Sequence, residues 1–178
     1  MSDLTSKPTT LTLPAIDARL VVTVLVAGAF ATIAFDFFGQ FLSPLLKDLA
    51  SPWLGAKLAP VPLANAVIGT VFGVPAKAVG DLGIGYGLHI LTGLIFYPLG
   101  YILVARPLSG LLPFVPWWVT GAAYGVALWI FALYFMAHLI AGNPPFLGWG
   151  SLTWVALWGH IVFGVVVAGV VQWREFRN

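Results

Sequence analysis

Charged side chains are scarce in this chain. Its 178 residues include eight Lys or Arg and six Asp or Glu, together 8% of the sequence, whereas 60% of the residues are hydrophobic. A soluble domain carries about 25% charged residues, which solvate its surface. The scarcity therefore excludes a water-exposed globular protein and predicts an integral membrane protein whose surface faces lipid.

Cysteine is absent, which excludes disulfides, thiolate metal sites and the covalent attachment of a c-type haem. The formal net charge is only +2 and the basic residues are scattered, so the sequence predicts no nucleic-acid partner. It also lacks a phosphate-binding loop, an HExxH pattern and a nucleophile arranged beside a base. These absences together predict that the protein is not an enzyme.

Long apolar runs take the place of the missing charge. No Asp, Glu, Lys or Arg occurs between residues 107 and 173, and the turn signal Gly142-Asn143-Pro144-Pro145 divides that stretch in two. A run of about 20 apolar residues can cross the hydrocarbon core of a bilayer. Pro98 falls within one such run, where it predicts a kink that neighbouring helices accommodate. The sequence predicts one membrane domain over residues 1–178, with tails at 1–19 and 174–178 and spans at 20–43, 84–105, 117–141 and 150–173.

The segment 44–83, between the first two spans, is rich in proline but carries an apolar stretch at 63–74. That stretch is too short to cross a bilayer. We therefore expect a short additional helix that is either interfacial or re-entrant, and the interfacial alternative is favoured.

Basic residues set the expected orientation, because Lys and Arg are enriched on the cytoplasmic side of a membrane. With the amino terminus inside, five basic residues are cytoplasmic and three lie in the opposite loop. The bias predicts that both termini are cytoplasmic. The cytoplasmic set is Lys7, Arg19, Arg106, Arg174 and Arg177, and the opposite set is Lys47, Lys57 and Lys77.

Small residues are spaced four apart in the last two spans. Gly121 and Gly125 form a GxxxG pair, and Gly164 and Ala168 form a similar pair. Lipid tails are as apolar as leucine, so spans associate through close backbone approach at such residues. We expect these pairs to pack helices within one chain, with dimerisation as the second alternative.

One aspartate and the three histidines of the chain fall inside the predicted spans, one residue in each: Asp36, His89, His138 and His160. At about 1.5 Å per residue they lie roughly 10, 8, 5 and 15 Å from the non-cytoplasmic face. An ionised carboxylate at such depth costs at least about 2.5 kcal/mol, so Asp36 needs a proton, water, a histidine or a cation. The alternative is purely structural hydrogen bonding, for example between Asp36 and Gln40 one turn away.

These residues are compatible with three kinds of site. Three imidazoles and a carboxylate suit a divalent metal such as zinc. His89 and His138, at similar depth, could instead ligate a b-type haem. The same groups could also relay or sense protons, because imidazole titrates near physiological pH.

Short motifs in the carboxy-terminal half carry a family resemblance. They are His89 at the start of a span, a glycine-rich third span ending in His138, Gly142-Asn143-Pro144-Pro145, Gly159-His160 and a closing Arg174-Glu175-Phe176-Arg177. In these motifs residues 88–178 resemble the YagU-type inner-membrane proteins. The resemblance implies a bacterial inner-membrane protein of largely uncharacterised function that is associated with acid tolerance, and a common polar site for the histidines. Around residues 36–44 the chain departs from the family, which leaves the part played by Asp36 open.

We therefore expect an all-α membrane protein, a four-transmembrane-helix bundle with an additional short helix between the first two spans. The leading functional hypothesis is a non-enzymatic accessory or stress-related protein of the bacterial inner membrane. One alternative is a structural subunit of a larger respiratory or photosynthetic complex. Another is a channel or transporter formed by a homo-oligomer, although no internal repeat or pair of broken helices favours transport by a single chain.

Overall fold

The computed structural model describes residues 14–51, 53–112 and 114–176. Four helical runs in these residues are long and apolar enough to cross a membrane. The prediction of an all-α bundle of four spans is confirmed, and the runs extend a few residues beyond several of the predicted bounds. They are Ala18–Leu45, Ile84–Ser109, Trp117–Ile140 and Ser151–Glu175.

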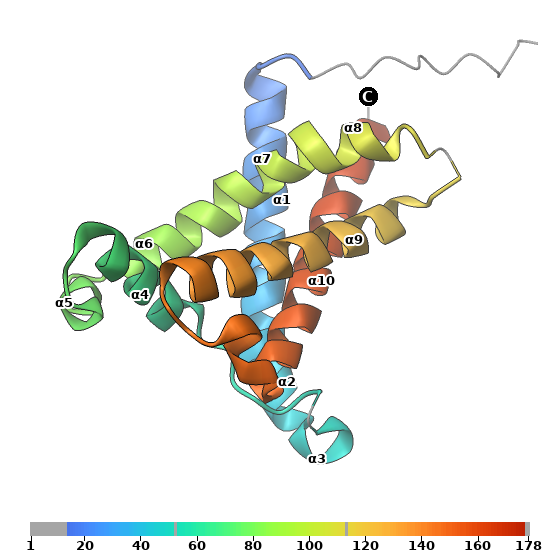
Figure 1. Ribbon diagram of the computed structural model, residues 1–178. Helices are drawn as coiled ribbons and strands as arrows, with labels where there is room; N and C mark the ends of the chain where they lie inside the picture. The colour runs from blue at the N-terminus through green and yellow to red at the C-terminus, as the bar shows by residue number, and fades with distance from the viewer. Residues whose placement is uncertain (1–13, 52, 113, 177–178) are drawn as a thin grey trace, which may run out of the picture.

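Each span is built from one or more consecutive helical segments (Figure 1). The first span consists of α1 (Ala18–Phe37), the π-helical η1 (Phe38–Leu42) and α2 (Ser43–Leu45). The second consists of α6 (Ile84–Leu91), η2 (Thr92–Phe96), α7 (Tyr97–Gly100), η3 (Tyr101–Ala105) and α8 (Arg106–Ser109). The third consists of α9 (Trp117–Ile130) and η4 (Phe131–Ile140), and the fourth is α10 (Ser151–Phe176). The connections contain α3 (Lys47–Ala50), α4 (Pro60–Phe72), α5 (Ala76–Asp81) and the 3-10 turn η5 (Pro145–Trp149).

Wide π-helical turns precede the prolines inside these spans. The segments η1, η2 and η3 each end two residues before a proline, at Pro44, Pro98 and Pro107 respectively. Proline has no N–H to donate and its ring clashes with the carbonyl four residues earlier, so a wider turn relieves the contact. The second span therefore continues through Pro98 as one helical run.

The first and fourth spans form the centre of the bundle. Within their most apolar windows, 39% and 50% of the residues are buried, against 22% and 28% in the second and third spans. In Figure 1, α1 and α10 lie next to each other while the second and third spans run obliquely across them. Of the four spans, the fourth exposes the fewest large hydrophobic side chains.

Glycines allow the third span to meet the fourth backbone to backbone. A Cβ atom added to Gly121 would lie 2.7 Å from the carbonyl oxygen of Gly164 and 2.8 Å from Cβ of Ala168. One added to Gly125 would lie 2.2 Å from the carbonyl oxygen of His160. The four small residues singled out in the sequence thus lie at one helix contact within the chain.

Glycines also allow the second span to pack closely against the first. A Cβ atom added to Gly28 would lie 2.2 Å from the carbonyl oxygen of Leu94, and one added to Gly93 would lie 2.4 Å from Oγ1 of Thr32. Side chains larger than hydrogen would separate the two helices at both positions. This crossing sets the relative position of Asp36 and His89, because Asp36 lies four residues after Thr32 and His89 four residues before Gly93.

The segment between the first two spans folds back onto the bundle. The expected short helix is present as α4, which packs against α5, α6 and η4. Before it, the amide of Leu58 donates to the carbonyl of Gly39 at 2.8 Å, and the Leu58 side chain is buried in the core. This segment therefore supplies part of the interior of the bundle as well as its surface.

Candidate functional site

Asp36 and His89 form an ion-pair contact between the first two spans. Nε2 of His89 lies 3.2 Å from each carboxylate oxygen of Asp36. Nε2 of Gln40, one turn along the first span, donates to Oδ1 of Asp36 at 3.1 Å. The side chains are 28% exposed for Asp36 and 15% for His89. An ionised carboxylate without a partner would be costly inside a span. Asp36 contacts both a histidine, His89, and Gln40, which are two of the partners considered from the sequence.

His160 is buried on the central span α10. Its Nδ1 lies 2.7 Å from the carbonyl oxygen of Ala156 in the preceding turn. A carbonyl oxygen can only accept, so Nδ1 carries the proton and Nε2 keeps its lone pair. The ring of Phe35 packs near both imidazoles, with its centroid 5.1 Å from that of His160 and 6.3 Å from that of His89.

His138 stabilises the turn at the end of the third span. Its Nδ1 lies 2.7 Å from the carbonyl oxygen of Asn143, and the Asn143 side-chain amide donates to the carbonyl of Ala137 at 3.1 Å. Gly142 between them adopts a left-handed conformation, with φ of 72°. These bonds fix the turn after η4, so His138 acts here as a helix-ending residue.

The four candidate polar residues do not form one metal site. Among the described residues, which include all four, no group of three or more His, Cys, Asp or Glu side chains could hold a metal ion. Asp36 and His89 come together, His160 lies beyond Phe35, and His138 is held by its own turn. The expected tetrahedral site is not formed, because equal depth in a membrane does not set the direction in which each helix points its side chains.

A largely apolar, partly open cavity of about 200 Å³ is lined by all four spans together with α4 and η5. His89 and His160 line this cavity, whereas His138 does not. The remaining lining is chiefly aliphatic and aromatic. Its polar members besides the histidines are Thr32, Thr92 and Tyr97.

Thr32 and Leu58 are cavity residues that sequence reasoning missed. Oγ1 of Thr32 is buried and has no hydrogen-bond partner among the described residues, although buried hydroxyls are normally bonded. Leu58 reaches the cavity from the connecting segment, where its side chain packs against Gly39 and Gly159. A threonine within an apolar span and a leucine in a loop give no sequence signal that distinguishes them from lipid-facing or surface residues.

Comparisons with known proteins add no information about the site, so its function is inferred from its geometry. No family model, no curated protein and no solved structure matches this chain. The resemblance to the YagU-type proteins therefore stays a prediction from short motifs.

Proposed function

We propose that this integral membrane protein is a non-enzymatic binding protein, which holds a small uncharged molecule with an apolar body and a hydroxyl group in its intramembrane cavity. The observation that carries the proposal is the cavity itself, an apolar space of about 200 Å³ into which only a few polar side chains enter. Ligand sites typically combine apolar walls with a few polar groups that orient the ligand.

The polar groups favour a ligand that donates a hydrogen bond. Nδ1 of His160 donates its proton to the carbonyl of Ala156, so Nε2, the nitrogen that remains available to a ligand, is a hydrogen-bond acceptor. An alcohol or phenol would satisfy this nitrogen of His160, whereas a ketone offers only a second acceptor.

The size and wall chemistry favour a compact ring as the apolar body. A dry apolar cavity of about 150 Å³ is large enough to bind benzene. The present cavity is somewhat larger, and the rings of Phe35, Tyr97, Phe131 and Phe163 line it. Aromatic side chains stack favourably on a ligand ring. The proposal thus specifies a hydroxylated ring or a short chain of similar volume.

Equilibrium dialysis of labelled phenol and labelled toluene against the detergent-purified protein tests the proposal. We expect phenol to bind more tightly than toluene by about 2- to 10-fold, the value of one net hydrogen bond. In a His160→Phe variant this preference should disappear. His138→Phe removes an imidazole outside the cavity and should leave the preference unchanged.

Equal binding of the two probes, or a preference that survives His160→Phe, would refute the proposal. A membrane subunit that co-purifies in fixed ratio would then favour the accessory-subunit alternative. A symmetric oligomer with measurable conductance would favour the channel.

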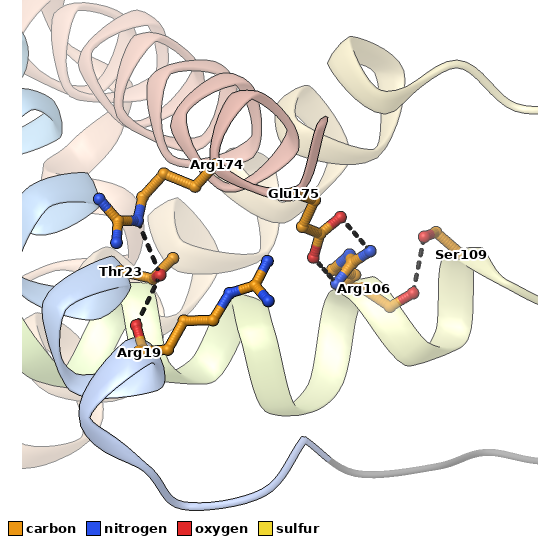
Figure 2. Close-up of polar contacts among 6 residues, drawn as sticks. All are labelled: Arg19, Thr23, Arg106, Ser109, Arg174 and Glu175. Atoms are coloured by element: carbon orange, nitrogen blue, oxygen red, sulfur yellow. Dashed lines mark hydrogen bonds and ion pairs between the residues drawn. The ribbon is translucent and has the colours of Figure 1, made fainter. Parts of the chain in front are cut away.

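We also propose that the protein lies in a bacterial inner membrane with both termini in the cytoplasm. Arg19, Arg106 and Arg174 support this orientation because they lie at one end of the bundle, as positively charged residues do on the cytoplasmic side (Figure 2). An accessory role in acid tolerance belongs to the same proposal and rests on the family resemblance alone. Accessibility of a tag at either terminus in sealed vesicles tests the orientation.

A further inference from the structure

Three arginines from three different spans meet at the end of the bundle opposite Asp36 and His89. Arg19 begins the first span, Arg106 lies near the end of the second and Arg174 near the end of the fourth. They line a second pocket of about 250 Å³ together with Asp17 and Glu175. The charged side chains among the described residues that line this pocket are thus three arginines and two carboxylates.

The two carboxylates of this arginine pocket are already engaged. Glu175 makes a two-pronged ion pair with Arg106, in which each oxygen faces one guanidinium nitrogen (Figure 2). Asp17 caps the first helix, since its Oδ1 accepts from the amide of Leu20 at 2.8 Å. Neither carboxylate forms an ion pair with Arg19, although Arg19 is close enough to Glu175 to interact with it electrostatically.

Hydrogen bonds hold the rest of the pocket in place. Nε of Arg174 donates to Oγ1 of Thr23 at 2.9 Å, and that hydroxyl donates to the carbonyl of Arg19 at 2.8 Å. The guanidinium of Arg174 is thereby fixed against the first span. In Figure 2 the Arg19 side chain extends toward the Arg106–Glu175 pair, whereas the Arg174 guanidinium lies at Thr23 on the other side of Arg19. All three arginines line the pocket.

We propose that the arginine pocket binds the phosphate group of an anionic ligand. A guanidinium matches phosphate oxygens with paired hydrogen bonds, and a basic pocket between span ends is a recurrent way of holding an anionic headgroup. The pocket lies at the ends of the membrane spans, the depth at which lipid phosphates lie. Phosphatidylglycerol and free inorganic phosphate share the chemistry that it recognises. The proposal does not rest on the function of the cavity at the other end.

Native mass spectrometry of the full-length protein with added phosphatidylglycerol or phosphatidylcholine tests the lipid source. We expect preferential retention of phosphatidylglycerol and a loss of affinity of about fivefold in Arg19→Gln, the effect of one interfacial arginine. Arg19→Lys keeps the charge but loses the paired geometry, so its loss should be smaller. Lys57→Gln removes the same charge from the opposite loop and should bind like the wild type.

Thermal unfolding of the lipid-free protein with inorganic phosphate, against sodium chloride at equal ionic strength, tests the soluble source. Stabilisation by phosphate that Arg19→Gln abolishes would identify free phosphate as the ligand. Arginine-dependent retention of phosphatidylglycerol without that stabilisation would identify the lipid headgroup. The proposal is overturned if Arg19→Gln binds both probes like the wild type, or if phosphatidylcholine binds as well as phosphatidylglycerol; the arginines would then only tie the helices together.

Discussion

Replacement of Gly125 by alanine probes one of the closest helix contacts in the bundle. The added methyl group would lie 2.2 Å from the carbonyl oxygen of His160, whereas ordinary contact begins at 3.4 Å. The neighbouring atoms are backbone atoms of His160 and Ile161, which cannot rotate away. The third and fourth spans would therefore have to separate by about 1.2 Å, the difference between these two distances.

Overpacking of this kind typically costs about 1–3 kcal/mol, and a rigid backbone neighbour places the cost toward the upper end. The higher helix propensity of alanine offsets up to about 1 kcal/mol of this loss of stability. We thus expect Gly125→Ala to lower the free energy of unfolding by about 2 kcal/mol. Titration with SDS in mixed micelles, followed by circular dichroism, measures this change. Because His160 moves with α10, the same variant should also lose its preference for phenol.

Gly87→Ala provides the matched control, since a Cβ atom at Gly87 meets nothing within 4 Å. Gly87 lies in the helix α6, so this variant should gain the propensity of alanine without a clash and be at least as stable as the wild type. Equal stability of Gly125→Ala and Gly87→Ala would refute the close approach of the two backbones and the packing argument built on it.

Three further substitutions test other contacts by the same unfolding assay. Thr32→Val removes a buried, unpartnered hydroxyl and should raise stability by about 1 kcal/mol; a decrease would mean that the hydroxyl is bonded. Leu58→Ala should cost at least about 2 kcal/mol, because it opens a void between Gly39 and Gly159; no loss would place Leu58 outside the core. Arg106→Gln should cost under about 1 kcal/mol, since its pair with Glu175 is partly exposed, and a larger loss would contradict this screening.

The fold class and the partners of Asp36 follow from the sequence for local reasons. A stretch without charge from residue 107 to 173 can only be solvated by lipid, so composition alone predicts the spans. Asp36 and His89 lie at nearly equal depth on consecutive antiparallel spans, and Gln40 lies one turn from Asp36. Their contact was therefore foreseeable, although only as one of several alternatives.

The tertiary structure alone decided which polar residues share a space. The rotation of each helix about its axis depends on its crossing with neighbours, as at Gly93 against Thr32, and depth along the sequence carries no record of that rotation. Hence His160 lines the cavity beside His89 while His138 closes a turn. The arginines are a second example. Their positions in the sequence predicted an orientation in the membrane, but only the packing of three helix ends placed them around one pocket.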